Sequence, residues 1–133
     1  MRLLWAVVHG LESASKQMQR EIGVTGPQRL VLRLVGHYKR LSPGDLAELM
    51  HVHPSSLTGV LRRLERARLI ARKSDPKDGR RAILTLTAKG QSVNGRRART
   101  VEASVRRTLE SLSATRIDAA RELLTTLASQ LDR

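Results

Sequence analysis

The stretch that decides the fold is LSPGDLAELMHVHPSSLTGVLRRLERARLI (residues 41–70), followed by ARKSDPKDGRRAILTLT (residues 71–87). Ser42 stands directly before Pro43, and Asp45 follows two residues later. A hydroxyl at the cap, proline at the first helical position and a carboxylate in the first turn are typical of a helix start. The sequence therefore predicts a short helix over residues 43–50.

A second helix is predicted from Pro54 to about residue 67, after a turn at residues 51–53. Its leucines recur at helical spacing, and the small residue Ala47 stands where the two helices must cross. His51 occupies the turn position that usually holds glycine, and histidine tolerates a left-handed backbone better than most residues. These features indicate a helix-turn-helix.

After residue 69 the spacing of apolar residues changes from the helical period to the alternation of a strand. Residues 70–74 and 81–87 have the composition of strands, with Ala82, Leu84 and Leu86 alternating with the other residues of the second run. Between them, residues 75–79 are all turn formers except one lysine. The sequence therefore predicts a β-hairpin with a basic, exposed tip.

The remaining segments favour helices. We expect a mainly α fold with a small β-hairpin wing, a winged helix-turn-helix flanked by N- and C-terminal helices. Residues 1–133 form one domain in this prediction, with the winged lobe at about 41–87 and flanking helices within 1–25 and 88–133. The four flanking helices are predicted at about residues 2–21, 27–39, 88–110 and 114–131.

Charge and composition narrow the classes of partner. The net charge is +13, and residues 51–81 alone carry nine basic and three acidic side chains, a net +6. A charge of this size attracts polyanions: nucleic acid, an anionic membrane surface or an acidic protein. No apolar run approaches the roughly 20 residues of a membrane span, and Leu3–Val8 is too short and amphipathic for a secretory signal. We therefore expect a soluble, cytoplasmic protein.

The outward face of the helix at 54–67 carries short hydroxyl side chains, a glycine and several arginines. Hydroxyls suit close approach to phosphates, Gly59 leaves room for a groove wall, and arginine can contact guanine or phosphate. The alternative is an ordinary amphipathic helix with a solvated basic face. The residues that we expect to contact DNA are Ser42, His53, Pro54, Ser55, Ser56, Thr58, Gly59, Arg62, Arg63, Arg66, Lys73, Lys77, Asp78, Arg80 and Arg81.

The hairpin tip provides a second expected contact. Gly79 allows a sharp turn, and Asp78 can hold the guanidinium of Arg80 by a bidentate contact. An extended arginine suits a narrow minor groove, where the negative potential is strongest. We therefore expect a helix in the major groove and an arginine in the adjacent minor groove.

The chain resembles the MarR family of winged helix-turn-helix regulators. The resemblance lies in residues 46–50, 52–58, 64–70 and 75–90, which include DPKDGRR and LTLTAKG. It implies an Asp-x-Arg wing, matched by Asp78 and Arg80, a DNA-binding lobe at about 41–87, and a homodimer that binds a pseudo-palindromic operator. The N- and C-terminal dimerisation helices that it implies lie within 1–25 and 88–133. Our hypothesis is a dimeric, sequence-specific repressor, or less often an activator, that a small ligand releases or retunes. Leucines near the C-terminus independently favour dimerisation, since they exceed what a small winged domain can bury.

The resemblance also implies a small aromatic or phenolic effector. Trp5, His9, Arg33 and Tyr38 could line its cleft, although packing for Trp5 and ordinary surface positions for the others are the simpler interpretation. His51 and His53 lie in the turn, where a helix cap or phosphate contact is simpler than a metal site. No cluster has metal-ligand spacing, so we expect no metal and no cofactor.

Enzymatic activity is not expected. The chain has no cysteine, no glycine-rich phosphate loop and no paired carboxylates in a cleft, and Asp75 and Asp78 are expected on an exposed hairpin. Lack of cysteine also excludes disulfides and thiol redox sensing. Two alternatives to a sequence-specific regulator remain: a non-specific architectural DNA-binding protein, and a protein-interaction module that uses a winged domain without DNA.

Overall fold

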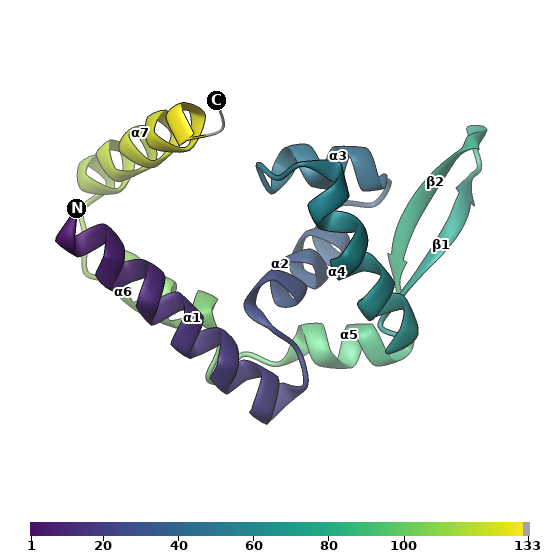
Figure 1. Cartoon of the computed structure of the whole chain (residues 1–133), viewed down its shortest axis with the longest axis horizontal. Helices are drawn as coiled ribbons and strands as arrows, with labels where there is room; N and C mark the ends of the chain where they lie inside the picture. The colour runs from purple at the N-terminus through teal and green to yellow at the C-terminus, as the bar shows by residue number, and fades with distance from the viewer. Residues whose placement is uncertain (132–133) are drawn as a thin grey trace. The chain divides into compact units, whose positions relative to one another are not determined.

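The computed structural model describes residues 1–131, which fall into two compact units, one of residues 1–97 and one from residue 98 onward. The elements of the first unit are α1 (Arg2–Ile22), α2 (Gly26–His37), α3 (Pro43–Leu49), α4 (Pro54–Arg66), β1 (Ile70–Asp75), β2 (Asp78–Leu86) and α5 (Ala88–Gly95) (Figure 1). The second unit contains α6 (Val101–Glu110) and α7 (Ala114–Leu131). The predicted fold class, mainly α with one hairpin, is confirmed.

The core of the first unit is aliphatic and lies where α2, α3 and α4 meet the base of the hairpin. Ala47 is buried at the crossing of α3 and α4, as predicted, because a larger side chain would hold the two helices apart. The sequence also predicts that Val52, in the turn before α4, helps to fill this core, but Val52 is exposed. The most deeply buried members of the core cluster are Val24, Val31, Leu32, Leu46, Leu57, Leu61, Leu64 and Leu84.

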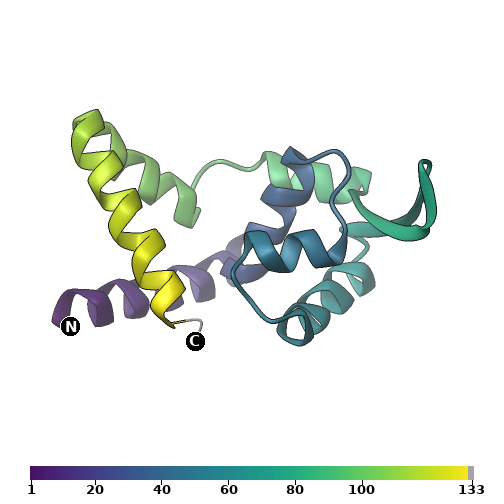
Figure 2. The same ribbon diagram turned by 90° about the horizontal axis from the view of Figure 1, so that it is seen from above.

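The hairpin is antiparallel and pairs Ile70 with Leu86 at its base and Asp75 with Asp78 at its tip. It projects from the helices in both views (Figures 1 and 2). Ile83 and Leu84 are both buried, although neighbouring strand residues face opposite sides of a sheet. The base of the hairpin is therefore covered on both faces, and the simple alternation predicted for β2 is wrong at Ile83.

Side-chain caps define where helices begin, as the sequence predicts for Ser42. Ser42 accepts a hydrogen bond from the Asp45 backbone N–H at 3.2 Å, and Asp45 Oδ2 accepts one from the Ser42 N–H at 2.9 Å. Thr87 accepts from the Gly90 N–H at 3.0 Å to begin α5. These bonds satisfy amide groups that a helix start leaves without intrahelical partners.

The sequence predicts one long helix over 88–110, and the structure breaks it into α5 and α6. Helix α5 ends at Gly95, Arg99 has a left-handed backbone (φ 57°), and Thr100 caps α6. Buried Arg29 of α2 donates from Nη1 to the Val93 carbonyl oxygen at 2.7 Å and from Nη2 to the Arg96 carbonyl oxygen at 2.6 Å. The guanidinium provides a donor for the Arg96 carbonyl oxygen at the end of α5, and it adds to the bond that the Val93 carbonyl oxygen accepts from the Arg96 N–H.

Among residues 1–131, no helix is both long and apolar enough to cross a membrane.

Candidate nucleic-acid interface

Helix α4 begins at a histidine cap. His53 Nδ1 accepts a hydrogen bond from the Ser55 backbone N–H at 3.3 Å and lies 2.7 Å from the Ser55 hydroxyl oxygen. Pro54 occupies the first turn, where its missing N–H costs nothing. The simpler interpretation of His53, a helix cap, is confirmed, and its ring fixes the Ser55 hydroxyl at the tip of the helix.

The turn before α4 has the backbone that its sequence implies. His51 adopts φ 51°, the left-handed region in which glycine is usual and histidine is tolerated. The Val52 N–H donates to the Ala47 carbonyl oxygen at 3.1 Å, which closes the turn onto the end of α3. The direction of α4 is therefore fixed by backbone bonds as well as by packing.

The face of α4 that points away from the core is polar and basic. Leu57, Leu61 and Leu64 are buried on the inner face, and a side chain added at Gly59 would meet only open space. The Thr58 hydroxyl donates to the Pro54 carbonyl oxygen at 3.0 Å, so it is partly engaged by its own helix. The exposed residues of this face are Ser55, Ser56, Thr58, Gly59, Arg62, Arg63 and Arg66.

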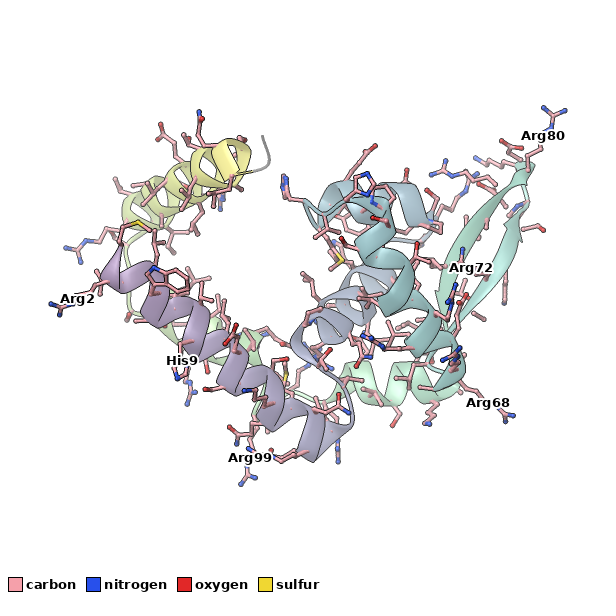
Figure 3. The ribbon with its side chains drawn as sticks, in the orientation of Figure 1. Arg2, His9, Arg68, Arg72, Arg80 and Arg99 are labelled. Carbon is pink, nitrogen blue, oxygen red and sulfur yellow. The ribbon has the colours of Figure 1, made fainter. Side chains whose placement is uncertain are left out.

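The wing tip differs in detail from the expected arrangement. Asp78 Oδ1 accepts a hydrogen bond from the backbone N–H of Arg80 at 3.1 Å, so it orders the tip rather than holding the Arg80 guanidinium. Gly79 lies inside β2 without a positive φ, and no left-handed turn is needed there. The Arg80 side chain extends outward from the end of the hairpin (Figure 3). The expected bidentate grip and sharp glycine turn are therefore wrong, while the extended arginine is present.

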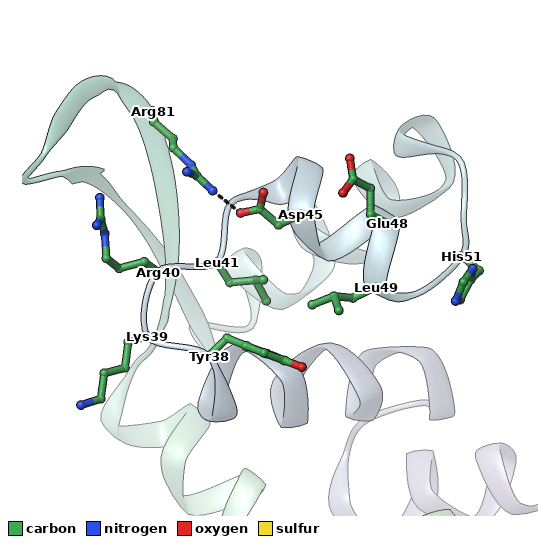
Figure 4. A pocket seen from close by; sticks show the side chains of 9 residues that line it. All are labelled: Tyr38, Lys39, Arg40, Leu41, Asp45, Glu48, Leu49, His51 and Arg81. Atoms are coloured by element: carbon green, nitrogen blue, oxygen red, sulfur yellow. Dashed lines mark hydrogen bonds and ion pairs between the residues drawn. The ribbon is translucent and has the colours of Figure 1, made fainter. Parts of the chain in front are cut away.

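Arg81 points back to the body of the first unit. Its Nη2 pairs with Asp45 Oδ2, the same carboxylate that caps α3 (Figure 4). The pKa of Asp45 is lowered, chiefly by the backbone hydrogen bond from Ser42 and also by the Arg81 guanidinium. Arg81 and Ser42, both expected to contact DNA, thus have structural partners in the same small cluster.

Asp75, which the sequence predicts on an exposed hairpin, is buried instead. Both of its carboxylate oxygens lie 2.6 Å from Arg40 Nη2, and Oδ1 also accepts from the Lys77 backbone N–H at 2.9 Å. These contacts lower its pKa, with the Lys77 hydrogen bond the largest cause and the Arg40 pair next. The other two predicted basic contacts on the hairpin, Lys73 and Lys77, are exposed.

The four residues expected to line an effector cleft lie on α1, on α2 and directly after α2. Trp5 and His9 lie exposed on α1, and Arg33 is half-buried on α2. Tyr38 alone of the four lines a pocket of about 710 Å³ between the end of α2, helix α3 and β2 (Figure 4). The residues lining this pocket are Tyr38, Lys39, Arg40, Leu41, Asp45, Glu48, Leu49, His51 and Arg81.

Sequence reasoning missed four charged residues that shape this region: Arg29, Arg40, Asp45 as a partner of Arg81, and Asp75. Sequence spacing could not pair them, because Arg40 and Asp75 are 35 residues apart and Asp45 and Arg81 are 36 apart. Only Arg29 could have been noticed in the sequence, because this charged residue occupies a buried position of α2. Within residues 1–131, no group of three or more His, Asp or Glu side chains could hold a metal ion.

A buried helix crossing, an exposed basic second helix and a projecting hairpin define a winged helix-turn-helix protein. Comparison with known proteins agrees. A family model described as the MarR family matches residues 22–81. HTH-type transcriptional repressor Rv2887 of Mycobacterium tuberculosis is 36% identical over 93 residues, which cover 70% of this chain and 67% of that protein. HTH-type transcriptional repressor MdtR of Bacillus subtilis is 41% identical over 80 residues, 60% of this chain and 48% of that protein.

Solved structures share the architecture. The CouR protein of Rhodococcus jostii bound to p-coumaroyl-CoA has a TM-score of 0.80 at 26% identity, covering 95% of this chain and 89% of that one. The S. aureus MepR–DNA complex has a TM-score of 0.79 at 23% identity over 98% of this chain and 96% of that one, which supports the fold alone. The chain belongs to the MarR family of transcriptional regulators.

Proposed function

We propose that this protein is a homodimeric repressor that binds a specific, pseudo-palindromic site in double-stranded DNA. The observation that carries the proposal is the exposed polar face of α4, which combines hydroxyls and an uncovered Gly59 at its N-terminal half with three arginines further along. Such a helix fits the major groove, where hydroxyls and arginines can contact base edges and phosphates. The names of the two repressors reported above support the direction of regulation.

The wing supplies the second contact in this proposal. Arg80 has no ion-pair partner among the described residues and extends from the hairpin tip. A projecting arginine can enter a narrow minor groove beside the site that α4 occupies. Lys73 and Lys77 on the same hairpin add charge near the phosphates.

Exposed apolar residues support the homodimer. Helix α1 exposes most of its large apolar side chains, and α7 exposes Leu123 at 66% and Leu124 at 61%. Apolar surface of this extent on a charged protein usually marks an interface. A two-fold dimer would present two copies of α4 to two half-sites, which accounts for a pseudo-palindromic operator.

We also propose that a small aromatic effector binds the repressor and releases it from DNA. The similar CouR protein binds p-coumaroyl-CoA, an aromatic thioester, in its crystal structure. Trp5 is the only tryptophan in the chain, so its fluorescence reports directly on a ligand near α1. Titration with p-coumaroyl-CoA should quench this fluorescence and weaken DNA binding if the effector site includes Trp5, His9 and Arg33.

The DNA-binding proposal is tested by Arg80→Ala in the full chain. We expect this variant to lose about 1–3 kcal/mol of DNA affinity, because one arginine contact is removed, with an unchanged thermal unfolding midpoint. Arg121→Ala is the matched control, since Arg121 pairs with Asp118 on α7, outside the proposed interface. Equal DNA affinity of the Arg80→Ala and Arg121→Ala proteins would contradict the role of the wing.

The architectural alternative predicts DNA binding without sequence preference, and a net charge of +13 alone would give such affinity. It differs from our proposal in the specificity ratio, the affinity for the preferred site divided by the affinity for unrelated DNA.

A further inference from the structure

Both strands of the wing are tied to one short segment, residues 40–45. On β1, buried Asp75 pairs with Arg40, with both carboxylate oxygens 2.6 Å from Nη2. On β2, Arg81 pairs with Asp45. Between these pairs, the Leu84 backbone N–H donates to the Leu41 carbonyl oxygen at 2.8 Å. Two ion pairs and one backbone hydrogen bond therefore join the hairpin to the start of α3, and we call this set of three contacts the wing clamp.

The Asp45 carboxylate has two partners, of which one, Arg81, belongs to the wing clamp. Its Oδ2 accepts from the Ser42 N–H at 2.9 Å and also pairs with Arg81. The Ser42 bond belongs to the capping box of α3, so the carboxylate is held in place whether or not Arg81 is present. A fixed anion at this position attracts the nearest mobile cation, which is the Arg81 side chain.

Neighbouring arginines on β2 thus have different environments. The charge of Arg81 is balanced by Asp45, whereas Arg80 extends from the tip without an ion-pair partner among residues 1–131 (Figure 3). The Asp45 pair uses one nitrogen of the Arg81 guanidinium, Nη2. A phosphate contact by the remaining N–H groups of Arg81 would bring a DNA phosphate toward the Asp45 carboxylate, and this contact is unfavourable because like charges repel.

We propose that Arg81 is a positioning residue of the wing, and that Asp45 both holds the wing through Arg81 and withholds this arginine from DNA phosphates. The second half rests on the proposed DNA-binding function. Arg80 then supplies the phosphate or minor-groove contact of the tip, and Arg81 sets the direction in which the tip is presented. This assignment replaces the sequence-based expectation that both arginines contact DNA.

Salt dependence of DNA binding separates the two roles. Each phosphate contact by a cation adds about 0.9 to the magnitude of the slope of log K against log salt concentration. The association constant K of the full chain for a mixed-sequence DNA duplex is measured between about 50 and 200 mM salt. The proteins compared are the wild type, Arg80→Gln, Arg81→Gln, Asp45→Asn and the Asp45→Asn/Arg81→Gln double variant. Asparagine at position 45 keeps an oxygen to accept from the Ser42 N–H, so α3 retains its cap.

We expect Arg80→Gln to lower the slope by about 0.9 per protomer and Arg81→Gln to leave it nearly unchanged. Asp45→Asn should raise the slope by about 0.9 per protomer, because the released Arg81 can reach a phosphate, and the double variant should return it to the wild-type value. A fall of about 0.9 in Arg81→Gln, equal to that in Arg80→Gln, would overturn the proposal. An unchanged slope in Asp45→Asn would overturn the withholding role of Asp45.

Hydrogen exchange tests the wing clamp without DNA. Arg81→Gln should speed exchange of the Leu84 amide by roughly three- to tenfold while amides in the middle of α4 keep their rates. Unchanged Leu84 exchange would overturn the positioning role. If wild-type protein failed to bind any duplex, the proposed function would be wrong, and this exchange measurement would still decide whether Arg81 positions the wing.

Discussion

The Arg29 guanidinium donates to the Val93 carbonyl oxygen at 2.7 Å, across 64 residues of sequence, and a second bond of 2.6 Å reaches the Arg96 carbonyl oxygen. Arg29 is 2% exposed, so these bonds form away from water. This charged side chain is buried in the first unit with two carbonyl oxygens as acceptors for its N–H groups. The end of α5 and the N-terminal part of α2 are joined by this contact.

Replacing Arg29 by leucine should therefore destabilise the protein. The Arg96 carbonyl oxygen would lose its charged donor, and the Val93 carbonyl oxygen would keep only its bond from the Arg96 N–H. Hydrogen bonds from charged donors contribute about 1.5–3 kcal/mol each to stability. We expect a loss of about 2–4 kcal/mol in the free energy of unfolding, measured by urea denaturation. Arg33→Leu on the same helix is the control, because Arg33 is only half-buried. A loss no larger than that of the control would show that the two bonds contribute little.

A second prediction concerns Gly90, which packs against the backbone at the base of the wing. A Cβ at this position would overlap the Leu69 carbonyl oxygen, which belongs to backbone and cannot move aside easily. Gly90→Ala should therefore destabilise the fold by about 1–3 kcal/mol or more. Gly95→Ala is a matched control in the same helix, because a Cβ there would meet open space, and it should be neutral or slightly stabilising. Similar melting temperatures for the two variants would contradict this account of the contact between α5 and the segment before β1.

Acid should weaken the wing clamp. The pKa of Asp75 is lowered below its ordinary value of 3.8 by the Lys77 N–H and by Arg40. A carboxyl group whose folded pKa is lowered stabilises the fold fully above the unfolded pKa and loses this contribution as pH falls through the folded pKa. We therefore expect the Asp75 contribution to be constant above about pH 6 and to decline below pH 3.8.

Urea unfolding of wild type and Asp75→Asn over this pH range checks the prediction. The stability difference between the two proteins should be largest near neutral pH and shrink in acid. Asp118→Asn is the control, since Asp118 lies in an exposed ion pair on α7. A difference that grows as pH falls would have the wrong sign for a carboxylate with a lowered pKa.

Dimerisation should depend on the apolar face of α7. Leu123→Lys and Leu124→Lys replace two exposed leucines by charged residues, which a protein interface buries only at high cost. We expect the double variant to sediment as a monomer while the wild type sediments as a dimer, with the helical content of both unchanged. Arg116→Glu on the same helix is a control for the change of charge. Wild-type protein that is monomeric at micromolar concentration would contradict the proposed homodimer.

Much of this fold could be predicted from the sequence because its signals are local. Ser42, Thr87 and His53 mark helix starts by their own hydrogen bonds, and the leucines of α4 mark its inner face by spacing alone. The break after Gly95 was not predictable in this way, because a donor from Arg29 on a distant helix satisfies the carbonyls there.

The same distinction applies to the interface. The exposed face of α4 follows from helical geometry, so its residues were predictable. The direction in which the Arg81 side chain points depends on its ion pair with Asp45, a residue that is distant in sequence and adjacent only after folding. Asp75 has the sequence context of an exposed turn residue. Its burial could not be predicted, because it depends on Arg40 in the connection between α2 and α3, which is distant in sequence.

Sequence-specific recognition of DNA is the central claim, and one measurement tests it most directly. Fragments of genomic DNA retained by the protein are sequenced, and the dissociation constant of the enriched site is compared with that of a shuffled duplex at physiological salt. We predict that the protein prefers the enriched site by roughly 10³-fold or more, and that this site is a pseudo-palindrome. A ratio near one would contradict the account and favour a non-specific DNA-binding protein whose affinity comes from charge alone.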